Sequence, residues 1–341
     1  MAITIKDVAK MAGVSISTVS RVLNNSKPVS EDIRERVEQV IKETGYVPNP
    51  VARSLVMRKS RIIGVIVPNI SNGRIGEYLS GIEEVGRMYQ YDLFLCNSYG
   101  ELKEEMKYVE LLRSKQVAGM VFLSWKLQEK VVDLIKESKI PTVFVSKNTE
   151  EFEDIHSVGV DHFHAAYDMT NYLIGLGHKK IAFLRTSIED DIKDSTVFKG
   201  YAKAHADNGL DISMNYVLQG DASSDSGYHL AKQLIEMREG RPTAIFASSD
   251  EAAAGALGAA IDTGLKVPDD ISIAGYANTA ITSLIRPALT TIHQPLYDIG
   301  AVSMRSLIKN IEGAQDVPET IRLAYSIVER STTRTLGEDE E

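Results

Sequence analysis

The chain has 341 residues, of which 43% are hydrophobic and 25% charged, and it contains one cysteine, Cys96. This length predicts two or three folded domains, and the composition excludes a disordered or fibrous protein. One cysteine excludes an intrachain disulfide and a thiolate metal cluster, and no apolar run reaches the roughly 18–20 residues that span a membrane. Because the N-terminus is charged where an export signal would be apolar, we expect a cytoplasmic globular protein without a metal or other cofactor.

Charge is divided unevenly along the chain. Residues 1–59 carry ten basic and six acidic side chains, a net charge of +4, whereas the remainder carries 28 basic and 41 acidic side chains, a net charge of −13. A small basic segment followed by a large acidic one indicates that only the basic segment meets a polyanion such as nucleic acid.

Apolar residues at helical spacing predict three short helices within residues 1–47. Gly13 is suited to end the first helix, Ser15 to cap the second and Ser30 to cap the third. Two short helices separated by a turn that contains glycine are typical of a helix-turn-helix unit. The predicted inner faces consist of Ile5, Val8, Ala9 and Ala12, then Val19, Val22 and Leu23, and then Val37, Val40 and Ile41.

The second helix of such a unit enters the major groove of DNA, and its first residues reach the base edges. Its outward candidates are Ile16, Ser17 and Arg21. Ile16 offers apolar contact to a thymine methyl group, and Arg21 offers a bidentate contact to guanine. Short polar side chains nearby are suited to phosphate oxygens, or in two cases to capping the helix instead. These candidates are Thr4, Ser15, Thr18 and Asn24, with Ser15 and Thr18 the possible caps.

The segments TIKDVAKMAGVSISTVSRVLNN and GYVPNPVARSL resemble the N-terminus of the LacI/GalR family of bacterial transcriptional regulators, and the likeness covers the whole chain. The resemblance implies a helix-turn-helix domain at 1–47, a hinge helix and linker at 48–60, and a two-lobed, Rossmann-like α/β core at 61–336, similar to periplasmic binding proteins. It implies one lobe at about 61–160 and 290–323, another at about 161–289 and 324–336, and an acidic tail at 337–341.

The hinge segment 51–55 amounts to about one helical turn, which is too short to be stable alone in water. The resemblance implies that this helix orders when two copies pair on operator DNA, and that Leu55 wedges into a minor-groove base step. Such a wedge partly unstacks the bases and kinks the duplex. The alternative is a plain linker with Leu55 buried on the core. The candidate hinge contacts are Asn49, Ala52, Arg53 and Leu55.

From Arg61 onward, short β-branched runs alternate with helical segments, which is the pattern of parallel βαβ units. Candidate strands lie at 62–67, 91–96, 120–123, 142–146, 180–184, 243–247 and 271–275. Candidate helices lie at about 75–88, 101–115, 162–175, 196–208, 226–238 and 250–264.

Ligands of such folds bind between the lobes, at the carboxyl ends of the strands. The candidate effector contacts there are Ser71, Asn72, Arg74, Trp125, Lys147, Asp161, Arg185, Asp250 and Asn278. Trp125 is suited to stack on a sugar ring, or else packs as a surface residue. If Arg74, Lys147 and Arg185 face the cleft, their charges favour an anionic ligand such as a phosphorylated or acidic sugar. Otherwise these long side chains extend into solvent at the rim.

Four positions depart from the family pattern for sugar and purine effectors. Arg74 replaces an aromatic residue, Val197 replaces an arginine four residues before Tyr201, Ala222 replaces an aromatic residue after Gly220-Asp221, and Ala277 replaces the aspartate of Gly-Phe-Asp. Aspartate and arginine hold sugar hydroxyls by charge-assisted hydrogen bonds. The sequence therefore disfavours an ordinary monosaccharide as the effector.

Residues 293–305 are similar to a helix of the catabolite control proteins of Gram-positive bacteria, which use a serine-phosphorylated phosphocarrier protein as corepressor. Asp298, Arg305 and Lys309 share one helical face, and arginine pairs bidentately with phosphoserine. The alternative is that this helix lies in a dimer interface or on the lobe surface. Two departures from that branch are Ser326, in place of an arginine, and Asn69, in place of an acidic residue.

We therefore expect a homodimeric repressor of carbohydrate-utilisation genes that binds palindromic double-stranded operator DNA in the nucleoid and responds to a sugar, a sugar phosphate or the phosphocarrier protein. A solute-binding protein is disfavoured by the basic head, and an enzyme by the lack of a nucleophile–base constellation. A metal site at Asp161, His162, His164 and Asp168 is disfavoured because a helix would place the two histidines about 200° apart.

Overall fold

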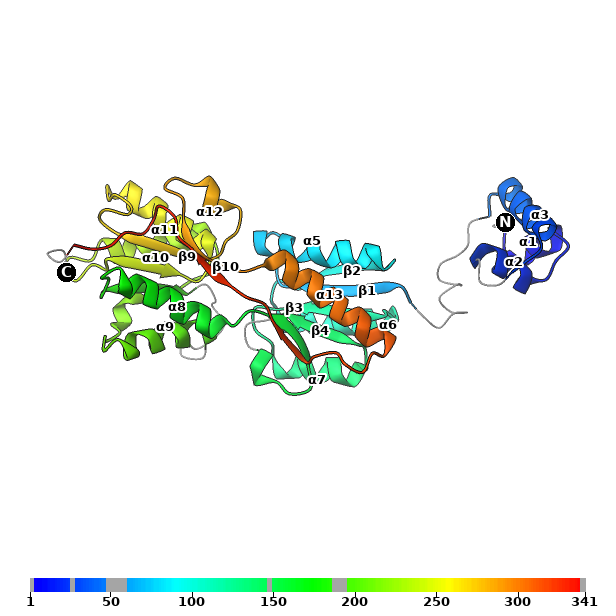
Figure 1. The fold of residues 1–341 in the computed structure, drawn as a ribbon, viewed down its shortest axis with the longest axis horizontal. Helices are drawn as coiled ribbons and strands as arrows, with labels where there is room; N and C mark the ends of the chain where they lie inside the picture. The colour runs from blue at the N-terminus through cyan, green and yellow to red at the C-terminus, as the bar shows by residue number, and fades with distance from the viewer. Residues whose placement is uncertain (1–2, 25–27, 47–59, 146–148, 186–194, 338–341) are drawn as a thin grey trace. The chain divides into compact units, whose positions relative to one another are not determined.

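The computed structural model describes residues 3–24, 28–46, 60–145, 149–185 and 195–337. The chain forms two compact units, Met1–Arg61 and Ile62–Glu341 (Figure 1). The expectations for Asn49, Ala52, Arg53, Leu55 and Lys147 concern residues outside the described ranges.

The N-terminal unit is a three-helix domain in which α1 spans Ile5–Met11, α2 Ile16–Asn24 and α3 Glu31–Thr44. Gly13 follows α1 with a φ of +65°, the left-handed conformation that the sequence predicted. Ser15 Oγ accepts the Thr18 N–H at 3.1 Å and caps α2, whereas Ser30 precedes α3 without a side-chain capping bond. The predicted core is confirmed, with Val8, Ala9, Ala12, Val19, Val22, Val37 and Val40 buried.

The C-terminal unit contains two six-stranded sheets, one in each lobe. The first sheet consists of β1 (Ile62–Val67), β2 (Asp92–Asn97), β3 (Gly119–Leu123), β4 (Thr142–Val145), β5 (His156–Gly159) and β11 (Thr320–Arg322). The second consists of β6 (Ile181–Arg185), β7 (Val217–Gln219), β8 (Ala244–Ala247), β9 (Ser272–Ala277), β10 (Thr290–His293) and β12 (Ser326–Val328). The strand orders are β11-β5-β4-β3-β1-β2 and β12-β10-β9-β8-β6-β7, and β12 pairs antiparallel to β10.

Helices cover both faces of each sheet. In the first lobe these are α5 (Gly73–Met88), α6 (Leu102–Ser114), α7 (Glu129–Ser138) and α13 (Leu296–Glu312). In the second lobe they are α8 (His162–Gly175), α9 (Thr196–Asp207), α10 (Ser224–Ile235), α11 (Asp250–Asp262) and the short α12 (Ile281–Leu284). Single 3₁₀ turns lie at Thr149–Glu151 and Met214–Tyr216.

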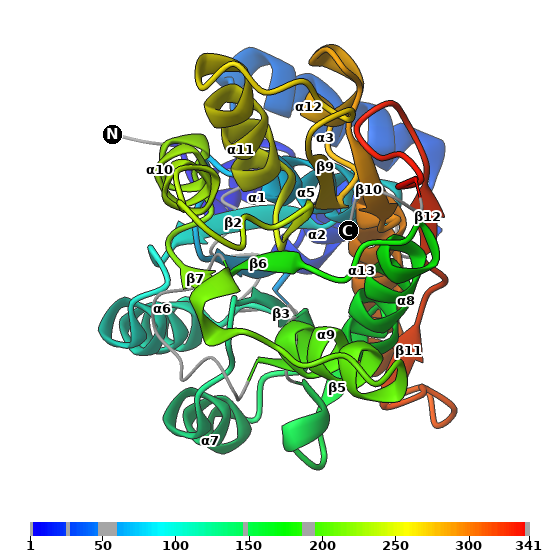
Figure 2. The same ribbon diagram turned by 90° about the vertical axis from the view of Figure 1, so that its left-hand side faces the viewer.

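Alternating strand residues divide the core of each lobe into two layers. In the first lobe, Ile63 and Val65 pack with α5 and α13, whereas Ile66 packs with α6 and α7. In the second lobe, Leu184 packs with α10 and α11 and Phe183 packs with α8 and α9, so that these helix pairs lie on opposite sides of the sheet (Figure 2). Strands buried on both faces read as continuous apolar runs, which explains why they were recognisable in the sequence.

The chain crosses between the lobes after β5, after β10 and after β11 (Figure 1). Assigning residues 290–293 to the first lobe was wrong, because these residues form β10 and pair with β9 of the second sheet. The crossover therefore lies at Gln294-Pro295, just before α13. The strands that the sequence did not predict, β5, β7 and β10–β12, have only three or four residues.

Candidate nucleic-acid interface and ligand pocket

The exposed face of α2 carries the three residues predicted to read bases. Ile16 is 44% exposed, and Ser17 and Arg21 are also exposed, while Val19 and Val22 on the opposite face are buried in the domain core. Because Ile16, Ser17 and Arg21 are exposed, their side chains are available to meet base edges in a major groove.

Short polar side chains lie at the starts of α1 and α2. Ser15 Oγ lies 2.7 Å from Ser17 Oγ and 2.8 Å from Thr18 Oγ1, in addition to capping the helix. The Thr4 hydroxyl donates to Asp7 at 2.6 Å, and these bonds from Thr4 lower the pKa of Asp7. A side chain that caps a helix, such as Ser15, is also exposed to solvent here. Phosphate contacts by these residues therefore stay a prediction. The structure describes no side chain for Asn24.

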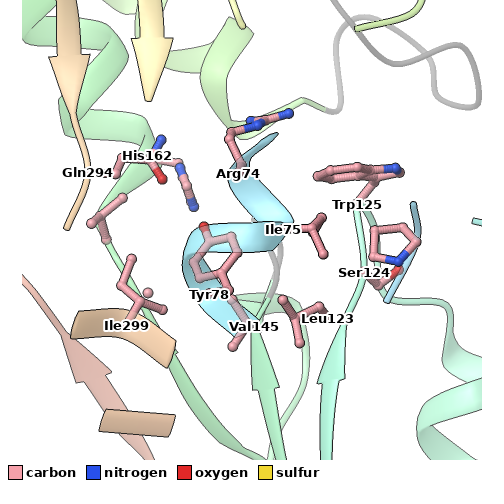
Figure 3. Close-up of a pocket in the computed structure, with 13 residues that line it drawn as sticks. Arg74, Ile75, Tyr78, Leu123, Ser124, Trp125, Val145, His162, Gln294 and Ile299 are labelled. Atoms are coloured by element: carbon pink, nitrogen blue, oxygen red, sulfur yellow. The ribbon is translucent and has the colours of Figure 1, made fainter. Parts of the chain in front are cut away.

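A pocket lies at the carboxyl ends of β1, β3 and β4 (Figure 3). Two of the predicted effector residues, Arg74 and Trp125, line it. The other lining residues are Pro68, Ile75, Tyr78, Leu123, Ser124, Val145, Gly159, Val160, His162, Gln294 and Ile299. Most of its wall is therefore aliphatic or aromatic, with a few polar groups, as is usual for small-molecule sites.

Arg74 contributes a buried positive charge to this pocket. Asn72 Oδ1 accepts the Arg74 N–H at 3.0 Å and so begins α5. The guanidinium carbon lies 5.1 Å from the centre of the Trp125 ring, which is cation–π distance, and Arg74 is 5% exposed. Its Nε–H has no hydrogen-bond partner within the described structure. Trp125 therefore stacks on a cation of its own chain.

Three further polar residues of the pocket were not predicted. Burial raises the pKa of Tyr78 to about 12, against the opposing charge of Arg74. His162 Nδ1 lies 2.7 Å from the hydroxyl of Tyr276, and Gln294 is buried in the crossover after β10. The four-residue spacing of Arg74 and Tyr78 on one helix was a usable signal. Nothing local marks His162 or Gln294, because crossovers bring them to the pocket.

The other candidate effector residues do not line this pocket. Ser71 is exposed after β1, Asn72 caps α5, and Arg185 is buried at the end of β6. Asn278 follows β9, where its Oδ1 accepts from Arg330 at 2.8 Å. Contacts by these residues to an effector remain predictions.

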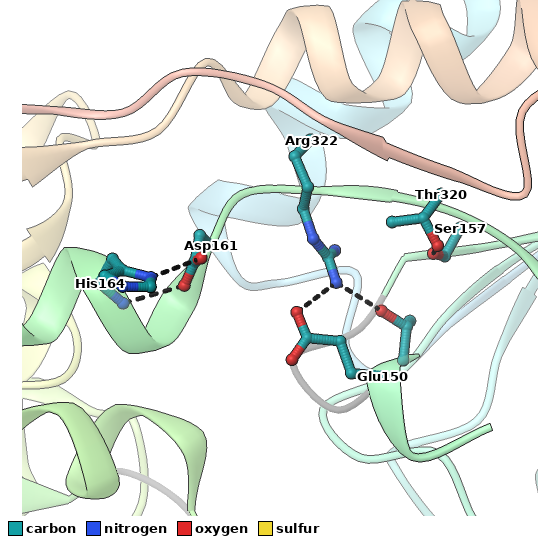
Figure 4. Close-up of polar contacts among 7 residues, drawn as sticks. Glu150, Ser157, Asp161, His164, Thr320 and Arg322 are labelled. Atoms are coloured by element: carbon teal, nitrogen blue, oxygen red, sulfur yellow. Dashed lines mark hydrogen bonds and ion pairs between the residues drawn. The ribbon is translucent and has the colours of Figure 1, made fainter.

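Asp161 begins the helix that follows the first crossover (Figure 4). Its Oδ1 accepts the His164 N–H at 2.9 Å, and its Oδ2 lies 2.7 Å from His164 Nδ1. Burial acts to raise the pKa of Asp161, but the bonds from His164 and the charges of His164 and Arg322 outweigh it and lower the pKa. Nearby, Arg322 of β11 donates to Glu150 at 2.7 Å. Both polar pairs flank segments that join the lobes.

Asp250 has a structural position, and the direct effector contact predicted for it stays a prediction. It is fully buried, its Oδ2 accepts the Thr279 N–H at 2.7 Å, and its Oδ1 accepts from the Thr291 hydroxyl at 2.6 Å. Burial raises the pKa of Asp250, although these bonds and the charge of Arg74 oppose that shift. Asp250 therefore links α11 to the segments around β9 and β10.

The predicted corepressor residues lie on the outer face of α13. Asp298, Arg305 and Lys309 are all exposed, while Met304 and Leu307 pack into the first lobe. The charged face is therefore available to a partner.

The two histidines at the start of α8 have different partners. His164 pairs with Asp161, while His162 faces Tyr276. Within the described ranges, no group of three or more His, Cys, Asp or Glu residues is placed to hold a metal ion, and no helix there is long and apolar enough to cross a membrane.

Comparison with known proteins agrees with this arrangement. Residues 4–49 match the lacI family of bacterial regulatory proteins, and residues 170–333 match the periplasmic binding protein-like domain. Catabolite control protein A of Priestia megaterium is 39% identical over 98% of this chain and all of its own length. The chain belongs to the LacI family.

Solved structures of LacI-family proteins have the same architecture. The lac repressor dimer bound to operator matches with a TM-score of 0.86 and 28% identity, over 98% of this chain and all of that one. The transcription regulator CcpA of Lactococcus lactis matches with a TM-score of 0.74 and 35% identity, over 81% of this chain and all of that one. These matches confirm the predicted family and fold. This LacI-family member is a DNA-binding transcriptional regulator of carbohydrate genes.

Proposed function

We propose that the chain is a homodimeric repressor that binds palindromic operator DNA in the bacterial cytoplasm and is controlled by an effector in its core. The observation that carries this proposal is the exposed face of α2, on which Ile16, Ser17 and Arg21 lie free of the domain core. Because the rest of the chain is strongly acidic, it repels a duplex and leaves the basic heads as the DNA contacts.

Dimerisation is supported by the free edge of the first sheet. Among the strands of the described ranges, β2 ends that sheet and pairs with β1 alone. Phe94 and Leu95 on β2 are 38% and 40% exposed, and Tyr99 just beyond it is 71% exposed. A monomer that leaves an apolar strand edge in water is prone to pair with another chain. A twofold dimer would present two heads to the two halves of a palindrome.

The pocket of Arg74 and Trp125 supports control by a small molecule. The pocket lies at the carboxyl ends of strands. Its lining includes His162, which follows the first crossover, and Gln294, which lies in the second crossover. A ligand bound there would contact segments that join the lobes and would thereby favour one spacing of the lobes over another. The sequence disfavours an ordinary monosaccharide here and favours an anionic effector such as a phosphorylated or acidic sugar.

Gel retardation of a palindromic duplex tests DNA binding directly. We expect the affinity to fall steeply as salt rises. Arg21→Ala should cost about 1–3 kcal/mol and relax the preference at one base pair in each half-site. Arg113→Ala, an exposed ion-paired residue on α6 of the core, is the matched control and should bind as the wild type does. Loss of affinity without loss of sequence preference in Arg21→Ala would exclude the base-reading role.

Bending of the same duplex tests the hinge. Leu55→Ala should weaken binding and remove the kink at the centre of the palindrome, because the wedge between bases is lost. The measurement is circular-permutation gel mobility. Equal bending by the wild type and Leu55→Ala would eliminate the wedge from the proposal.

A second candidate effector is a serine-phosphorylated phosphocarrier protein, favoured by the exposed charges on α13. Arg305 and Lys309 lie one turn apart and are suited to pair with a phosphoserine. Titration with the phosphorylated protein should raise operator affinity, and Arg305→Ala should reduce that effect tenfold or more. Arg113→Ala, on the opposite face of the first sheet, serves as the control. An equal response to the unphosphorylated protein would rule this candidate out.

A further inference from the structure

Two buried donors of the pocket lack acceptors within the described structure. Arg74 Nε and Gln294 Nε2 have no hydrogen-bond partner, although the two residues are only 5% and 3% exposed. Buried donors in proteins are nearly always paired. Two open donors on the wall of one pocket, contributed by α5 and by the crossover after β10, indicate that acceptor atoms of a ligand belong there.

Tyr78 adds a third donor to the same wall. Figure 3 shows its hydroxyl directed toward the side chain of His162, which also lines the pocket. Burial raises the pKa of Tyr78 to about 12, so the hydroxyl keeps its proton at neutral pH and is able to donate it. The donors thus belong to Arg74, Tyr78 and Gln294, two of them one turn apart on α5.

The pocket also limits the size and the charge of its ligand. Its cavity volume is about 40 Å³, which is space for about three waters at roughly 10–15 Å³ each and hence for one small polar group. Arg74 is the one cation among its lining residues. Asp250 lies close enough to act on Arg74 electrostatically, but it does not line the pocket, and its two oxygens accept hydrogen bonds from Thr279 and Thr291. A ligand with a single negative charge fits these surroundings better than a dianion.

We propose that this pocket binds a carboxylate group, so that the small-molecule effector of the chain is a carboxylic acid. This inference rests on the effector-controlled regulator proposed above. A carboxylate carries one charge, offers about four acceptor sites and brings no hydrogen of its own, which matches three donor groups of which one, Arg74, is a guanidinium. A neutral sugar brings hydroxyl hydrogens that need acceptors. A phosphate monoester carries nearly two charges and is costlier to bury beside one cation.

Calorimetric titration of the full-length protein tests the proposal, with D-gluconate and propionate as carboxylate probes and glucose and glucose 6-phosphate as comparisons. Trp125 is the only tryptophan of the chain and touches the Arg74 guanidinium, so its fluorescence reports on this pocket. We expect saturable heat and a saturable change in emission with at least one carboxylate. Arg74→Gln and Gln294→Leu should each weaken that binding tenfold or more. Arg87→Gln, an exposed ion-paired residue at the end of α5, should not.

The outcomes separate this proposal from the proposed function. Saturable binding of glucose or glucose 6-phosphate without carboxylate binding would overturn the ligand class. Carboxylate binding that is indifferent to both Arg74→Gln and Gln294→Leu would overturn the site. In either case, retardation of operator DNA by the same preparations would leave the DNA-binding function standing, whereas its failure would count against the proposed function itself.

Discussion

His178 provides a test of the second lobe that is independent of the ligand pocket. It is 1% exposed, with Nδ1 3.0 Å from Thr243 Oγ1 and Nε2 3.0 Å from Ser272 Oγ. Ser272 Oγ already accepts the N–H of Arg334 at 3.2 Å, so its own hydrogen is directed to Nε2. Thr243 Oγ1 donates to the carbonyl of Lys180 and accepts from Nδ1. We assign the neutral tautomer with its hydrogen on Nδ1 from this network.

Burial lowers the pKa of His178 from 6.5 to about 4. Protonation of His178 at Nε2 would also direct an N–H at Ser272 Oγ, which already accepts a hydrogen bond from Arg334. As the pH falls from 6.5 toward 4, the unfolded chain takes up a proton that the folded chain excludes, so the free energy of unfolding decreases in this window and is unaffected above it. The shift corresponds to a loss of about 3 kcal/mol below both pKa values, and of about 2 kcal/mol at about pH 5.

Urea denaturation between about pH 7 and pH 5 measures this loss. His178→Gln keeps a donor and an acceptor but does not titrate, so the wild type should lose about 2 kcal/mol more than this variant over that interval. His229→Gln, at an exposed position on α10, should retain the pH dependence of the wild type. Equal pH dependence of the wild type and His178→Gln would refute the assignment of a buried neutral imidazole.

Three further substitutions test packing, assembly and the role of Asp250. Gly81→Ala places a Cβ 2.1 Å from the Tyr297 carbonyl oxygen and should lower the free energy of unfolding by about 1–3 kcal/mol. The control is Gly76→Ala, which has nothing within 4 Å of its Cβ and should be neutral or stabilising. Equal effects of the two substitutions in urea denaturation would contradict the contact between α5 and α13. Leu95→Asp on the free edge of β2 should shift sedimentation from dimer to monomer, and a persisting dimer would remove that edge from the interface. Asp250→Ala leaves two buried threonine hydroxyls and one N–H unpaired and should cost about 2–4 kcal/mol, whereas unchanged thermal stability would contradict its structural role.

Local patterns in the sequence were sufficient for the N-terminal domain and for most strands of the core. The three helices follow from apolar spacing and from Gly13 and Ser15, all of which act within a few residues of chain. Apart from the edge strand β2, the long strands of the lobes were recognisable because both of their faces are buried, which requires continuous apolar runs. These features depend on interactions between residues that are close in the sequence. Hydrophobic periodicity and capping residues therefore reveal them.

Only the tertiary structure determined which residues line the pocket and which lobe the short strand β10 belongs to. Trp125 contacts Arg74, 51 positions earlier, and crossovers bring His162 and Gln294 to the same wall. Asp250 follows a strand as a ligand contact would, yet segments around β9 and β10 supply donors that bury it. The short strand β10 belongs to the second sheet because its ladder partner is β9. Each outcome depends on which distant segments the fold places side by side, and hydrogen bonds and burial between such segments leave no periodic pattern in the sequence.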